Sequence, residues 1–82
     1  MDDEALHIVI AQKLQDGRLP RDRPARVYGC PGNGEICAAC GSAVPKAQML
    51  IEIERTVLQD GTVTKLHARC FQILESERQK LA

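Results

Sequence analysis

The side chains best suited to joint chemistry in this sequence fall into two pairs of equal spacing. Cys37 and Cys40 are separated by two residues, and so are His67 and Cys70. Zinc takes four nitrogen or sulfur ligands in a tetrahedron, and a Cys-x-x-Cys turn presents two thiolates to one side of the ion. With all four positions filled by protein, no coordination place remains for water or substrate. The pattern therefore predicts one structural Zn²⁺ ion held by three cysteines and one histidine.

The segment between the two pairs has the pattern of a β-hairpin. Alternation over residues 49–54 predicts a strand with one buried face. The expected buried side chains are Met49, Ile51 and Ile53, and the opposite face carries Leu50, Glu52 and Glu54. Asp60-Gly61 is a turn signal, and the β-prone residues 62–65 follow it.

From about Ala68 a helical period runs toward the end of the sequence. Its expected apolar face comprises Phe71, Leu74 and Leu81, and its solvated side Glu75, Glu77, Arg78 and Lys80. In the first turn of such a helix, His67 and Cys70 face the same way. A turn with two ligands, a hairpin and a helix start with two ligands is the layout of a treble-clef zinc finger. We therefore expect a small α+β, zinc-bound domain.

The first residues predict another helix, from Asp2 to Gln15. Acidic residues at its start suit the helix dipole, and Gly17 is placed to end it. Its apolar face is broader than one core-facing stripe requires. The helix is thus expected to pack in the domain's own core or to be shared with a protein partner, including a second copy. His7 is interpreted as an ordinary helix residue.

Proline and glycine are dense between residues 17 and 36, which excludes a helix and makes a long central strand improbable. The segment also carries the local basic excess: Arg18, Arg21, Arg23 and Arg26. These arginines are either a solvated loop surface or contacts for phosphate or an acidic partner. The predicted organisation is an N-terminal helix (1–17), an Arg/Gly/Pro-rich connector (18–36) and a zinc-finger module (37–82).

Cys30 leaves an alternative open. An all-cysteine site would combine it with Cys37, Cys40 and Cys70, but this discards the paired spacing of His67 with Cys70. We therefore interpret Cys30 as an ordinary thiol in a turn. A thioredoxin-like redox pair is disfavoured, because its Cys-x-x-Cys would begin a helix in a βαβ unit and here the pair precedes a hairpin.

Composition explains why the chain needs a metal. It has 82 residues, no Trp, one Phe and one Tyr, so its core is thin. Zinc binding contributes about 10 to 16 kcal/mol in small fingers, and zinc removal is expected to unfold at least residues 37–75. Eleven basic and eleven acidic residues balance, which argues against a surface that coats nucleic acid.

The remaining expectations concern compartment and chemistry. The acidic start and the short apolar stretch at residues 8–11 predict no export signal, and no apolar run approaches the ~20 residues of a membrane span. We expect a cytoplasmic protein that does not bind membranes. No acid/base pair remains outside the ligands, because the carboxylates are scattered on predicted solvent faces, so no enzyme activity is expected.

Two resemblances follow from these motifs. Cys37-Ala-Ala-Cys40, Pro45-Lys46, Asp60-Gly61 and His67-Ala-Arg-Cys70-Phe71 resemble the zinc finger of poly(ADP-ribose) polymerases. That resemblance implies a zinc module that recognises DNA breaks, with basic residues on phosphates and apolar residues against bases. Here the ligand spacing is slightly shorter, acidic side chains line the hairpin and stacking aromatics are absent, which argues against DNA binding.

The chain as a whole is similar to a group of small bacterial zinc-finger proteins of uncharacterised activity. The shared pattern is a helix, Asp-Gly-Arg-Leu-Pro at residues 16–20, an aromatic with Gly-Pro-Gly-like turns at 28–34, and the two ligand pairs. Where that group has glycine this sequence has Cys30, which supports an ordinary thiol.

Three functions are compatible with the sequence. The first is a non-enzymatic zinc module that binds a protein partner or itself through the N-terminal helix. The second is a small DNA-binding regulator that contacts phosphates through the loop of Arg18 to Arg26. The third is a thiol redox sensor in which Cys30 acts beside the zinc thiolates.

Overall fold

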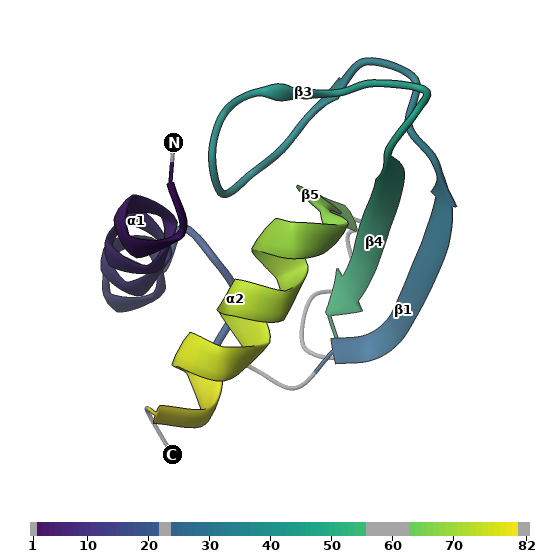
Figure 1. Cartoon of the computed structure of the whole chain (residues 1–82). Coiled ribbons are helices and arrows are strands. Elements are labelled where there is room, and N and C mark those ends of the chain that lie inside the picture. The colour runs from purple at the N-terminus through teal and green to yellow at the C-terminus, as the bar shows by residue number, and fades with distance from the viewer. Residues whose placement is uncertain (1, 22–23, 56–62, 81–82) are drawn as a thin grey trace.

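The computed structural model describes residues 2–21, 24–55 and 63–80 as a small, compact α+β fold (Figure 1). Its elements are helix α1 (Asp3–Gln15), strands β1 (Pro24–Pro31), β2 (Glu35–Ile36), β3 (Ala43–Val44), β4 (Met49–Arg55) and β5 (Val63–His67), and helix α2 (Ala68–Lys80). Strands β1, β4 and β5 form an antiparallel sheet in the order β1-β4-β5, and β2 pairs with β3. The segment around β3 arches from the sheet toward α1 (Figure 1).

The antiparallel pairing of β4 with β5 confirms the predicted hairpin strands, whereas the predicted turn at residues 60–61 lies outside the described residues. The expected burial pattern of β4 is only partly correct. Ile51 and Ile53 are buried, but Met49 is 55% exposed and Leu50 is fully buried. Leu50 stands opposite His67 and therefore shares its face of the sheet, where the His67 ring contacts the Ala43 carbonyl of β3. Strand β4 is thus covered on both faces at this point.

Strand β1 was not expected from the sequence, which predicted a connector over these residues. It is eight residues long and lies at the edge of the sheet. Proline is tolerated in edge strands and at strand ends, and here Pro24 and Pro31 are the first and last residues of β1. The breakers therefore exclude a central strand, as predicted, but allow an edge strand.

Helix α1 agrees with its prediction. The Asp2 side chain caps it by accepting from the Ala5 N–H at 2.8 Å, and Gly17 follows its end with a φ of 79°. One stripe of the helix is buried, consisting of Leu6, Ile10 and Leu14. This stripe packs toward α2, while Ile8 is 55% exposed. The helix therefore packs in the domain's own core.

Helix α2 begins directly after β5 and buries Cys70, Ile73 and Leu74. Phe71 is half-buried, and Leu81 lies outside the described residues. The predicted solvated side is largely wrong, because the side chains of Glu77, Arg78 and Glu75 are only 12%, 17% and 27% exposed, and of the four residues Lys80 alone is mostly exposed. For Glu77 the physical reason is α1, whose His7 Nδ1 lies 3.0 Å from Glu77 Oε2. Among the described residues, neither helix is long and apolar enough to cross a membrane.

One core connects these elements. Its members come from both helices, both sheets and the loops between them: Leu6, Ile10, Leu14, Leu19, Cys37, Ala39, Val44, Leu50, Ile51, Ile53, Leu66, Cys70, Ile73 and Leu74. Two cysteines of the sequence motif are therefore part of the same packed interior as the helices. Packing and the proposed metal site must form together.

The β1–β2 connection passes so close to β3 that it requires glycine. A Cβ on Gly32 would lie 2.5 Å from the carbonyl oxygens of Val44 and Pro45, which are backbone atoms. We expect Gly32→Ala to destabilise the fold by about 1–3 kcal/mol, as overpacking does. Denaturant unfolding of the zinc-loaded protein measures this change.

Gly29→Ala is the matched control for Gly32→Ala. The nearest atom to its added Cβ would be the Met49 sulfur at 3.2 Å, the end of a flexible and exposed side chain. Its effect on the free energy of unfolding should be the smaller of the two. Equal effects would contradict the close approach at Gly32.

Candidate metal centre

The four residues of the paired motif come together in the fold. The ligand atoms of Cys37, Cys40, His67 and Cys70 all lie within 4.8 Å of one another. In a tetrahedral site with metal–sulfur bonds of about 2.3 Å, neighbouring sulfurs lie about 3.8 Å apart. The cluster therefore could hold one metal ion after small side-chain adjustments.

A tight turn between β2 and β3 presents the first two ligands. The Cys37 N–H donates to the Ser42 carbonyl, and the Gly41 N–H donates to the Cys37 carbonyl, both at 2.9 Å. Gly41 has a φ of 78°, a conformation that favours glycine. The Ala38 N–H donates to the Lys65 carbonyl at 2.8 Å, which fastens this turn to β5. We call the segment Cys37–Gly41 the knuckle.

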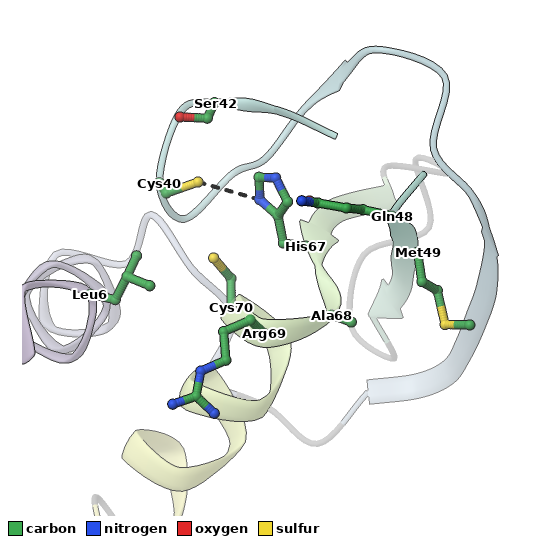
Figure 2. Close-up of a pocket in the computed structure, with 9 residues that line it drawn as sticks. All are labelled: Leu6, Cys40, Ser42, Gln48, Met49, His67, Ala68, Arg69 and Cys70. Atoms are coloured by element: carbon green, nitrogen blue, oxygen red, sulfur yellow. Dashed lines mark hydrogen bonds between the residues drawn. The ribbon is translucent and has the colours of Figure 1, made fainter. Parts of the chain in front are cut away.

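The last two ligands lie where β5 passes into α2. His67 is the final residue of the strand, not a helix residue as expected, and Cys70 lies in the first turn of α2. Their side chains nevertheless point to the same space, facing the Cys40 sulfur (Figure 2). The junction between β5 and α2 therefore positions His67 and Cys70, whereas the sequence predicted that a single helical turn would position both.

The hydrogen bonds of the His67 ring indicate which nitrogen would bind a metal. Its Nε2 lies 3.1 Å from the Ala43 carbonyl oxygen, and its Nδ1 lies 3.4 Å from Cys40 Sγ. A carbonyl can only accept, so Nε2 carries the hydrogen and Nδ1 is left with a free lone pair. This contact orients the ring as the outer partners of metal-binding histidines do. Nδ1 is therefore the ring atom that would face a metal.

The thiols of Cys37 and Cys70 compete for one proton. The hydrogen bond from the Cys70 thiol is the largest cause lowering the pKa of Cys37, and the backbone N–H groups of Cys40 and His67 add to it against burial. The same bond, burial and the charges of Cys37 and Cys40 raise the pKa of Cys70. One thiolate is therefore stabilised within the protein, and further thiolates need a cation among them.

Lys13 is a residue of this site that sequence reasoning missed. Its ammonium group donates to the carbonyls of Ala38 at 3.0 Å and Ala39 at 2.8 Å, so the last turn of α1 holds the knuckle. It also places a positive charge on the backbone of the knuckle. A lysine in the last turn of a helix indicates only dipole compensation, and nothing local in the sequence indicates a contact with a turn far along the chain.

The arginines of the predicted contact patch bind the protein itself. Arg18 pairs with Asp16 at 2.7 Å, and Arg21 donates to the Leu14 carbonyl at the end of α1. Arg26 lies 4.0 Å from Glu54. Arg23 lies outside the described residues. Arg18, Arg21 and Arg26 thus serve separate local contacts.

Cys30 lies in β1 and outside the cluster, which contains His67 instead. Its sulfur is 3.6 Å from Glu52 Oε1. Burial, followed by the hydrogen bond and charge of Glu52, raises the pKa of the Cys30 thiol. This residue is therefore an ordinary protonated thiol outside the cluster, but it lies in a strand and not in the turn that the sequence predicted.

The arrangement suits the binding of a soft divalent cation through four protein donors. Two of the donors, Cys37 and Cys70, are buried, and two are half-buried. A site filled in this way stabilises a fold and leaves no ligand position for a substrate. No family model, no curated protein and no solved structure matches the chain.

Proposed function

We propose that the protein is a non-enzymatic zinc module of the treble-clef type, in which Cys37, Cys40, His67 and Cys70 hold one structural ion. The observation that carries this proposal is the convergence of these four ligand atoms within 4.8 Å. Thiolate and imidazole donors in a tetrahedron suit zinc better than magnesium or calcium, which prefer oxygen. The order of knuckle, β-hairpin and helix supports the treble-clef assignment.

A structural ion implies that the module acts by binding other molecules. Several large apolar side chains remain exposed on the described surface: Ile8, Val27, Tyr28, Ile36 and Met49. Such side chains suit contacts with a protein partner or a second copy. Arg18, Arg21 and Arg26 already have partners within the chain, so contacts of these residues with nucleic-acid phosphates receive less support.

Metal analysis of the purified protein tests the proposal. We expect one zinc ion per chain in the wild type, loss of that zinc in His67→Ala and retention in Cys30→Ser. Cobalt substitution adds a check, because three sulfur ligands in a tetrahedral site give intense charge-transfer and d–d absorption.

His67→Ala and Cys30→Ser distinguish the three-cysteine, one-histidine site from the all-cysteine site, the two ligand sets that the sequence left open. Zinc retained in His67→Ala and lost in Cys30→Ser would overturn the assignment in favour of an all-cysteine site. His67→Cys is the rescue variant, since it restores four donors at the same place and should bind zinc again.

A further inference from the structure

A pocket opens on one side of the metal centre. Its volume is about 630 Å³. Its walls comprise Leu6, Cys40, Ser42, Gln48, Met49, His67, Ala68, Arg69 and Cys70 (Figure 2). A water molecule takes about 30 Å³ of liquid, so the pocket holds far more than one ion. Small solutes can therefore reach the ligands from this side.

The three thiolates do not share this access equally. Cys37 is 1% exposed and does not line the pocket. Its sulfur also accepts the His67 N–H at 3.4 Å, which engages a lone pair. Cys70 lines the pocket but is only 2% exposed, whereas Cys40 is half-buried and borders the opening. Cys40 is the thiolate that an incoming molecule meets first.

We propose that Cys40 is a modification site, at which a small hydroperoxide entering the pocket oxidises the thiolate. This inference rests on the proposed zinc site, which keeps Cys40 as a thiolate. The sulfur lone pair attacks one peroxide oxygen, an S–O bond forms and the O–O bond breaks. Sulfur is oxidised to sulfenic acid, and the peroxide is reduced to an alkoxide or hydroxide that takes a proton from water.

The pocket walls suit this class of reactant. Ser42 and Gln48 are polar wall residues that can meet the peroxide oxygens, and Arg69 forms part of the wall at the start of α2, with its guanidinium directed away from the Cys40 sulfur (Figure 2). Arg69 is also paired with Asp3, which anchors it to α1 and moderates its charge. Oxidation of Cys40 removes one donor, so the centre then holds its metal less tightly. The redox role considered for Cys30 is thus reassigned to a ligand.

Site-resolved labelling of the zinc-loaded full chain tests the inference. The sample is treated with hydrogen peroxide, sulfenic acid is trapped with a 1,3-dione, and mass spectrometry identifies the labelled residue while a colorimetric chelator reports zinc release. We expect the earliest label on Cys40, with zinc release following it. Met49 lines the same pocket, so Met49→Leu serves as a background that removes competing sulfoxide formation.

Two variants make the outcome decisive. Cys40→His keeps four donors while removing the reactive sulfur, and should slow zinc release by about tenfold or more. Cys30→Ser should leave the release rate unchanged. First labelling of Cys30, Cys37 or Cys70 in a fully zinc-loaded sample would overturn the inference and leave the proposed function standing. A chain that binds no zinc would instead overturn the proposed function.

Discussion

Complete removal of the metal is expected to unfold the protein instead of leaving a folded apo form. Zinc contributes about 10–16 kcal/mol to small fingers, more than a thin core can supply. The core here includes two of the ligand residues, Cys37 and Cys70, and has no buried aromatic side chain among the described residues. Metal loss and loss of packing are therefore one event.

Far-ultraviolet circular dichroism and amide proton dispersion before and after chelation measure this effect. We expect helical signal and dispersion to disappear together and to return when zinc is added back. The same cycle on Cys30→Ser is the control, because that thiol lies outside the cluster. Unchanged spectra after verified removal of all metal would contradict the prediction and show that packing alone supports the fold.

The parts of the site that the sequence predicts are those encoded locally. A Cys-x-x-Cys turn ending in Gly41 and a His-x-x-Cys pair at a strand-to-helix junction each carry their geometry within a few residues. The helix boundaries are readable for the same reason, since Asp2 caps α1 and Gly17 follows its end. The cluster could therefore be predicted down to its individual ligands.

The contacts that the sequence does not predict are the long-range ones. Lys13 reaches the knuckle across 25 residues, and His7 reaches Glu77 across 70 residues. No local pattern distinguishes such a lysine or histidine from a solvated one. Strand β1 is another feature that the sequence does not predict. Its prolines and glycine are typical of a connector, and it becomes a strand because it pairs with β4, which is distant in the sequence. Burial of Leu50 depends likewise on packing against core residues that are distant in the sequence.

These long-range contacts make α1 part of the metal module, which is one of the two roles that the sequence left open for this helix. Its buried stripe packs toward α2, Lys13 holds the knuckle, and Asp3 pairs with Arg69, which lies between the last two ligands. The acidic side chains of Asp2 and Asp3 thus both have partners within the same chain. The exposed part of α1 that remains for a partner is the side of Ile8.

Truncation of Ile10 in α1 is consequently expected to weaken zinc binding, although this residue is not a ligand. Ile10 is fully buried, and Ile→Ala substitutions in cores cost about 2–5 kcal/mol. When the apo chain is unfolded, metal binding supplies the folding energy, so a loss of packing appears in full as a loss of apparent metal affinity. At 1.4 kcal/mol per factor of ten, Ile10→Ala should raise the apparent zinc Kd by about 30- to several thousand-fold.

Competition with a chelator of known affinity measures this change, and Ile8→Ala is the matched control. Ile8 lies on the same helix, loses the same atoms and is 55% exposed, so its apparent zinc Kd should stay within a few-fold of the wild type. An unchanged Kd in Ile10→Ala would show that α1 folds independently of the finger. A large change in both variants would indicate instead that Ile8 is covered, as it would be by a second copy, and concentration dependence of the Kd would reveal that association.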